Sequence, residues 1–144
     1  MDHDVTTLEQ LESYAESFLG SLSVFDDTAT LITLTGDLGA GKTTFTQILG
    51  KKLGVTSEVT SPTYVIEQRY DIEHEHFSTL VHIDAYRLEQ EDDALKIGLD
   101  QTLNDPKNLV IIEWPEKIAD FLEKYLKTDI TIELHDGVRM LSIE

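Results

Sequence analysis

The segment from residue 36 to residue 43, Gly-Asp-Leu-Gly-Ala-Gly-Lys-Thr, fits the pattern G-x-x-x-x-G-K-[ST] at every position. In this pattern the glycines let consecutive backbone N–H groups face phosphate oxygens, and the lysine and the hydroxyl serve phosphate and Mg²⁺. Residues 29–35 before it are apolar and β-branched, as in a buried strand. Apolar residues recur at helical spacing after it: Phe45, Ile48, Leu49 and Leu53. This strand–loop–helix order favours nucleotide binding over a glycine-rich turn that carries a lysine by chance.

The motif also predicts individual roles. We expect Lys42 to contact the β- and γ-phosphates and Thr43 to be the hydroxyl ligand of Mg²⁺. Thr44 lies beside them, with helix packing as its alternative role. The residues expected to contact the nucleotide from this segment are Leu38, Gly39, Ala40, Gly41, Lys42, Thr43 and Thr44.

Length and charge restrict the remaining possibilities. The 144 residues predict one domain, spanning residues 1–144, and the absence of cysteine excludes disulfides and thiolate-bound zinc. The net charge is −17, from 28 acidic and 11 basic residues, which disfavours direct binding to nucleic acid. Any involvement with RNA would then pass through a partner. The acidic start does not resemble a signal peptide and no segment approaches the ~20 apolar residues of a membrane span, so a cytoplasmic location without membrane contact is expected.

Regular elements are predicted along the whole chain. A helix should begin near Thr7, which with Gln10 resembles a capping box, and end around Gly20. An acidic helix is expected from Glu89 through Leu95. A further helix should start at Pro115 and turn four side chains inward: Ile118, Leu122, Tyr125 and Leu126. Strands are predicted at Val65–Tyr70, Phe77–Asp84, Leu109–Ile112, Ile130–Leu134 and Val138–Ile143, the last two joined by the hairpin dipeptide Asp136-Gly137.

Strands that alternate with helices predict an α/β class, here a three-layer P-loop NTPase-like fold. The central sheet should be mixed and partly parallel, with antiparallel hairpin additions. Two of the predicted strands end in a carboxylate, Asp84 and Glu113. Ligands in such folds sit at the carboxyl ends of parallel strands, where both carboxylates would meet Lys42 if the strands are neighbours. One could anchor Mg²⁺ and the other orient the attacking water, and the sequence is compatible with either assignment.

Several other groups have two interpretations. Ser61 and Thr63 stand where many such proteins have a nucleotide-sensing loop, although local hydrogen bonding explains them equally. Arg87 could neutralise phosphate charge or pair with the acidic surface. Residues 74–76, His-Glu-His, have metal-ligand spacing but are more simply explained as a polar turn. Residues 126–129 lack the leading Asn or Thr of a guanine-reading motif, which disfavours a GTPase.

Four blocks in order together resemble one family: residues 36–45, Ser61-Pro62-Thr63-Tyr64, residues 82–88 and Ile112-Glu113-Trp114-Pro115. The resemblance is to the TsaE (YjeE) family of ATPases in tRNA threonylcarbamoyladenosine biosynthesis and covers nearly the whole chain. It implies binding of ATP or ADP with Mg²⁺, weak hydrolysis alone, and action on the TsaB–TsaD heterodimer, with tRNA met only through that complex.

The resemblance also implies residue roles. Lys42 and Thr43 would hold phosphate and metal, Glu113 would contribute to the Mg²⁺ site, and Asp84 would be needed for hydrolysis. Trp114 belongs to the same functional block. The segment Gly137-Val138-Arg139 resembles a family Gly/Arg segment near the nucleotide, which implies a nucleotide contact for Arg139.

Two other functions are compatible with the phosphate motif. A P-loop small-molecule kinase usually closes an arginine-bearing lid over the transferred phosphate. This chain has three arginines, Arg69, Arg87 and Arg139, and no spare segment for a lid. A non-catalytic adaptor that only binds nucleotide is disfavoured by the presence of both Asp84 and Glu113. Hydrolysis is therefore the preferred hypothesis.

Overall fold

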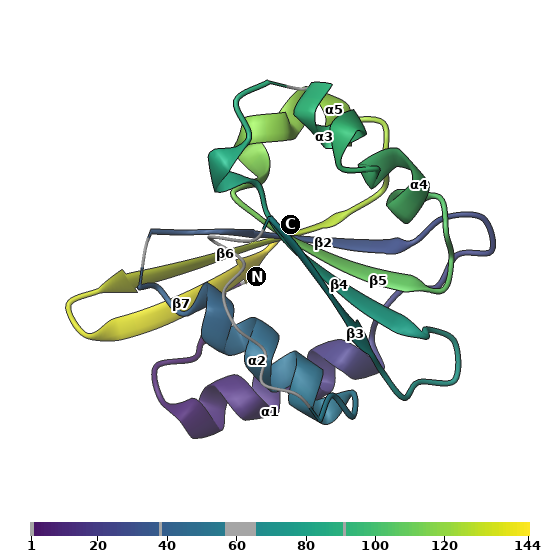
Figure 1. The fold of residues 1–144 in the computed structure, drawn as a ribbon. Helices are drawn as coiled ribbons and strands as arrows, with labels where there is room; N and C mark the ends of the chain where they lie inside the picture. The colour runs from purple at the N-terminus through teal and green to yellow at the C-terminus, as the bar shows by residue number, and fades with distance from the viewer. Residues whose placement is uncertain (1, 38, 57–65, 91) are drawn as a thin grey trace.

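The strand before the phosphate motif lies in the middle of the sheet (Figure 1). The computed structural model describes residues 2–37, 39–56, 66–90 and 92–144. In these residues the sheet order is β1-β7-β6-β2-β5-β4-β3. The strands are β1 (Asp2–Asp4), β2 (Thr30–Thr35), β3 (Glu67–Asp71), β4 (Thr79–Asp84), β5 (Asn108–Glu113), β6 (Thr128–His135) and β7 (Val138–Ile143).

The sheet is mixed, as the sequence predicts. Strands β6, β2, β5 and β4 run parallel. Strands β7 and β3 flank them antiparallel, and β1 pairs antiparallel with β7 at the outer edge. The parallel register aligns Leu34 with Glu113 and Glu113 with Asp84. The carboxyl ends of three neighbouring strands therefore meet at one edge, which confirms the expected α/β fold and the expected neighbours.

Helices cover both faces of the sheet (Figure 1). The two long helices, α1 (Leu8–Gly20) and α2 (Lys42–Lys52), pack on one face around Phe18, Phe45 and Leu49. The other face carries short helices, α3 (Asp92–Lys96), α4 (Leu99–Leu103) and α5 (Ala119–Leu122), with the 3₁₀ turns η1 (Ala85–Arg87) and η2 (Pro115–Ile118). Two apolar cores thus enclose the sheet and fix the strand ends that carry polar side chains.

Two local predictions are confirmed in detail. Thr7 caps α1, accepting the amide of Gln10, and the Gln10 side chain accepts the amide of Thr7. The β6–β7 turn places Asp136 at φ 51° and Gly137 at φ 80°, the left-handed pair of a two-residue hairpin.

Several element boundaries differ from the predictions. The strand predicted to begin at Val65 is described from Glu67, and Val65 itself lies outside the described residues. The helix predicted from Glu89 begins at Asp92, because the Asp93 carboxylate accepts the amides of Glu89 and Gln90 and caps the chain there.

The prediction for Leu126 is wrong. The helix that follows Pro115 is a 3₁₀ turn and then α5, which ends at Leu122, so Leu126 lies in the link to β6 and is 74% exposed. Ile118 and Leu122 are buried as expected, and Tyr125 is half-buried. The apolar spacing continued past the point where the chain leaves the helix.

Among the described residues no helix combines the length and apolar character needed to cross a bilayer.

Candidate functional site

The phosphate motif forms a tight loop between β2 and α2. Gly36, Gly39 and Gly41 have φ of 149°, 81° and 110°, values that L-residues with side chains rarely adopt. A Cβ on Gly36 would stand 2.2 Å from the carbonyl oxygen of Ile132, so the backbone approach itself requires glycine. Helix α2 begins directly after Gly41 without a side-chain cap. The first N–H groups of a helix have no partner within the helix, which makes this end suited to an anion.

Lys42 is held beneath the loop. Its side chain is almost buried, at 5% exposed, and its Nζ donates to the Gly36 carbonyl at 2.8 Å. The same Nζ lies 4.0 Å from the centroid of the Trp114 ring. Burial lowers the pKa of Lys42, while the carboxylates of Glu113 and Asp84 act in the opposite direction. The ammonium is thus a partly desolvated cation beside two acids.

The two carboxylates lie side by side at the ends of β4 and β5. Asp84 and Glu113 are register partners and are 4% and 3% exposed. Asp84 Oδ1 accepts the amide of Tyr86 at 2.9 Å, which fixes the start of η1. Glu113 Oε2 is 2.6 Å from Nε2 of His82, a residue with no exposed surface. The convergence expected from the sequence is confirmed.

Trp114 closes one side of the site from an unusual backbone. It has φ 57° and ψ 50°, a left-handed conformation that is uncommon for a bulky residue. The following Pro115 begins η2, and this geometry turns the indole over the Lys42 ammonium. Tyr86 packs against it with ring centroids 5.2 Å apart and is 48% exposed.

Arg139 reaches the opposite side of the loop from β7. Its Nε donates to the Ala40 carbonyl at 2.8 Å, and its side chain lies within 3.1 Å of where a Cβ on Gly41 would stand. Its backbone amide donates to Thr6 Oγ1 just before α1. The last strand therefore ties the loop to the first helix.

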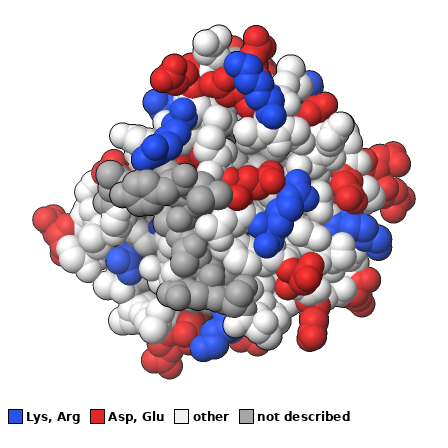
Figure 2. Space-filling view, in the orientation of Figure 1, with Lys and Arg blue, Asp and Glu red and all other residues white. Residues whose placement is uncertain are grey.

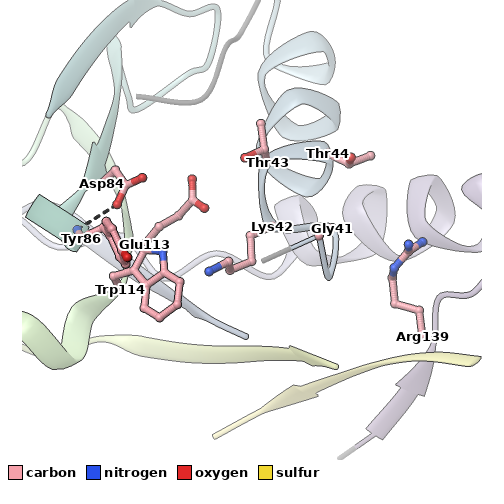
Figure 3. A pocket seen from close by; sticks show the side chains of 10 residues that line it. Gly41, Lys42, Thr43, Thr44, Asp84, Tyr86, Glu113, Trp114 and Arg139 are labelled. Atoms are coloured by element: carbon pink, nitrogen blue, oxygen red, sulfur yellow. Dashed lines mark hydrogen bonds between the residues drawn. The ribbon is translucent and has the colours of Figure 1, made fainter. Parts of the chain in front are cut away.

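These residues surround a cavity of about 300 Å³. Figure 3 shows Asp84, Glu113 and Trp114 on one side of Lys42 and Arg139 on the other. The lining residues are Gly39, Gly41, Lys42, Thr43, Thr44, Asp84, Tyr86, Glu113, Trp114 and Arg139. A hydroxyl and two carboxylates beside a helix N-terminus are hard oxygen donors of the kind that Mg²⁺ takes together with phosphate oxygens. The chemistry of the cavity thus fits a magnesium nucleotide.

Most residues predicted for the site line this cavity, and a few do not. Ala40 is buried behind the loop, where its amide donates to the Asp37 carbonyl and its own carbonyl accepts Arg139. Leu38, Ser61 and Thr63 lie outside the described residues. Arg87 is exposed on η1.

Residues 74–76 behave as a polar turn. Nδ1 of His74 accepts the amides of His76 and Phe77, in the connection between β3 and β4. In the parts of the chain that the structure describes, no three His, Cys, Asp or Glu side chains are grouped so that they alone could hold a metal ion.

Sequence reasoning missed two residues at the site, His82 and Tyr86. Both belong to the sequence block around Asp84. Tyr86 was missed because its exposure depends on the turn η1, and His82 was missed because its position in the sequence is typical of a strand core. The single sequence clue was a histidine within an otherwise apolar strand, two positions before a candidate carboxylate.

The described basic side chains do not gather into one large area on the face shown in Figure 2. Acidic side chains surround that face, with basic side chains interspersed among them. This distribution is consistent with the net charge of −17 and offers little attraction to a phosphate backbone.

The chain is similar over most of its length to known proteins. A family model for the threonylcarbamoyl adenosine biosynthesis protein TsaE matches residues 5–140. The tRNA threonylcarbamoyladenosine biosynthesis protein TsaE of Streptomyces coelicolor is 42% identical over 69% of this chain and 67% of its own length. The Bacillus subtilis protein of that name is 40% identical over 64% of this chain and 54% of its own length, and the Rickettsia bellii protein 31% over 92% and 86%. The crystal structure of Bacillus subtilis YdiB has a TM-score of 0.72, 26% identity, and covers 99% of this chain and 83% of that one.

Proposed function

Because the chain belongs to the TsaE family, whose members act in tRNA threonylcarbamoyladenosine biosynthesis, we propose that it is a Mg²⁺-dependent ATPase of that pathway. The observation that carries the proposal is the cavity in which Lys42, Thr43, Asp84 and Glu113 meet at the N-terminus of α2. A cation, a hydroxyl and two carboxylates in that arrangement are the groups that nucleotide hydrolysis uses.

The phosphate chain of ATP or ADP would be bound by the loop and the first turn of α2. Backbone N–H groups from Gly39 to Thr44 would face phosphate oxygens, and Lys42 would exchange its bond to Gly36 for the β- and γ-phosphates. Arg139, already fixed against the loop, would add positive charge on the other side.

Thr43 and Glu113 would hold the metal, either directly or through water. The bound Mg²⁺ would supply neutralisation of the negative charge that develops on the phosphates. Asp84, the neighbour of Glu113 across the strands, would orient the attacking water. The resemblance places Glu113 at the Mg²⁺ site and makes Asp84 necessary for hydrolysis, and the water-orienting task of Asp84 is part of this proposal. The buried position of both acids supports a role at the phosphates.

The proposed substrate-side partners are proteins. We infer that the chain acts on the TsaB–TsaD heterodimer and meets tRNA only through that complex, since its net charge of −17 opposes direct contact with RNA. Hydrolysis would then drive a change in the partner complex.

The test is ATP hydrolysis with and without purified TsaB–TsaD. The wild-type protein should be weakly active alone and stimulated by the heterodimer, and Lys42→Ala should be inactive in both conditions. Lys51→Ala, at the exposed end of the same helix, is the control for loss of a positive charge from α2. A wild-type rate that the heterodimer leaves unchanged, or a fully active Lys42→Ala, would refute the proposal.

A second experiment tests the pathway. Nucleoside analysis of tRNA from cells depleted of this protein should show loss of threonylcarbamoyladenosine, and the wild-type gene should restore it where the Lys42→Ala gene does not. Unchanged modification after depletion would count against a role in this pathway.

A further inference from the structure

His82 and Glu113 form a buried pair directly behind the cavity. Nε2 of His82 is 2.6 Å from Oε2 of Glu113, and the two residues are 0% and 3% exposed. His82 lies on β4 two positions before Asp84, so both side chains project from the same face of the strand. The pair therefore joins the core of the sheet to one of the two acids at its edge.

The hydrogen bond has a defined direction when Glu113 is ionised. A carboxylate only accepts hydrogen bonds, so Nε2 carries the hydrogen and donates it. Among the described residues Nδ1 of His82 has no hydrogen-bond partner. Among the described residues Glu113 is thus the one hydrogen-bond partner of this imidazole. The bond uses one of the two carboxylate oxygens of Glu113.

A histidine at this place is costly for packing alone. Its neighbours along β4 and β5 include Leu80, Leu109 and Ile111, all without exposed surface. Burying a polar ring with one nitrogen unpaired carries a desolvation penalty that an aliphatic side chain would avoid. The hydrogen bond to Glu113 therefore indicates that His82 has a role other than packing.

Glu113 needs such a bond. Its register partner is Asp84 on the parallel neighbour β4, so two carboxylates lie on adjacent strands, where their like charges repel. A charge-assisted, buried hydrogen bond on Oε2 holds the Glu113 side chain against this repulsion and leaves Oε1 for the cavity.

We propose that His82 is a positioning residue for Glu113, whose free carboxylate oxygen it directs at the metal of the bound nucleotide. This inference rests on the proposed function, because it gives Glu113 the metal-binding task. Outer partners of metal ligands act in this way by fixing the ligand's orientation, and their loss typically costs about 10-fold to 100-fold in metal affinity or activity.

Three substitutions separate positioning from packing. His82→Leu removes the donor and keeps an apolar strand. His82→Gln places an amide N–H about where Nε2 stands, whereas His82→Asn is too short to reach Glu113. Ile111→Val, at the register partner of His82 on β5, controls for a small change in the same core.

The main measurement is calorimetric binding of ADP with saturating Mg²⁺ and with EDTA, supported by the Mg²⁺ dependence of hydrolysis. His82→Leu and His82→Asn should lose about 10-fold to 100-fold in the gain of affinity that Mg²⁺ provides. Their Mg²⁺-free ADP affinity should stay within about twofold of wild type, because the loop and Lys42 are untouched. His82→Gln and Ile111→Val should keep the wild-type Mg²⁺ dependence.

The outcomes distinguish this inference from the function on which it rests. If wild-type protein binds ADP with no effect of Mg²⁺, the proposed function fails. If wild type depends on Mg²⁺ and folded His82→Leu does so equally, only the role of His82 fails. If His82→Leu does not fold, the comparison of His82→Gln with His82→Asn decides, and equal Mg²⁺ dependence of those two variants would overturn the inference.

Discussion

The ammonium of Lys42 lies 4.0 Å from the centroid of the Trp114 ring and at the same time donates to the Gly36 carbonyl at 2.8 Å. Both contacts stabilise a cation that is 5% exposed. A phosphate group bound at the loop would compete for the same ammonium.

Trp114 should report nucleotide binding by its fluorescence. It is the single tryptophan of the chain, so the tryptophan emission comes from this one side chain. Saturating ATP or ADP should draw the Lys42 ammonium from the ring and change the emission, and Lys42→Met should lose this response. Lys117→Met, which removes the more distant cation above Tyr86, should retain it. An unchanged wild-type spectrum under conditions where calorimetry shows bound nucleotide would contradict the prediction.

Nucleotide binding should take up protons at alkaline pH. Burial lowers the pKa of Lys42 below its ordinary value of 10.5, so the folded protein holds this proton less tightly than the unfolded chain. The contribution of Lys42 to the free energy of unfolding therefore increases as pH rises from the lowered pKa towards 10.5, and the fold becomes more stable over that range. Phosphate oxygens raise the pKa again, so protons should be taken up on binding in that range. Calorimetry of ADP binding in buffers of different ionisation enthalpy measures the uptake, and equal uptake by Lys42→Met would assign it to another group.

Asp84→Asn should separate binding from hydrolysis. The amide keeps the size of the side chain and an oxygen that can accept the amide of Tyr86, so η1 should keep its geometry. Hydrolysis stimulated by the partner should fall by about 100-fold or more, the scale of a lost acid–base group, while ADP affinity stays within a few-fold. Asp71→Asn, on an exposed position of β3, is the charge control. Full partner-stimulated turnover of Asp84→Asn would remove Asp84 from the mechanism.

Gly36→Ala should be more destabilising than Gly39→Ala. A Cβ on Gly36 would meet the Ile132 carbonyl oxygen at 2.2 Å, whereas a Cβ on Gly39 meets nothing within 4 Å. Gly39→Ala should then cost about 1–2 kcal/mol for its φ of 81° alone, and Gly36→Ala about 3 kcal/mol or more because the β6 backbone must move as well. Urea unfolding measures both, and equal losses would mean that the approach of the Gly36 loop to β6 does not restrict the position.

Thr7→Ala should weaken the start of α1. The substitution removes the hydroxyl that accepts the Gln10 amide, and losing such a cap costs about 1 kcal/mol. Ser13→Ala, on an exposed position within the same helix, should change stability by less than about 0.5 kcal/mol. Thermal or urea unfolding of both variants is the measurement, and equal effects would show that the cap contributes little.

The phosphate loop and the two acids were predictable because each depends on short-range pattern. Glycines that fit one loop conformation, a β-branched run before Gly36 and apolar runs that end at Asp84 and Glu113 are all local features. Their meeting at one edge needed only the rule that ligands lie at the carboxyl ends of parallel strands. The observed strand order and register bring the carboxyl ends of β2, β5 and β4 together as expected.

The features that sequence reasoning missed depend on distant contacts. Strand β1 is three residues long and exists through its pairing with β7, with Asp4 opposite Met140. Helix α4 is five residues long and starts at a left-handed Gly98. The bond between His82 and Glu113 joins residues on neighbouring strands whose register only the fold defines. Leu126 was misplaced because helical spacing does not reveal where a chain turns away from its core.

The contact between Arg139 and Ala40 has a consequence for biosynthesis, since its two ends lie 99 positions apart in the sequence. A ribosome releases the loop long before it releases the guanidinium that braces it. Strand β2 likewise pairs on both of its edges only after β6 has been synthesised. The loop therefore reaches its braced conformation only after the final hairpin of the nascent chain has left the ribosome.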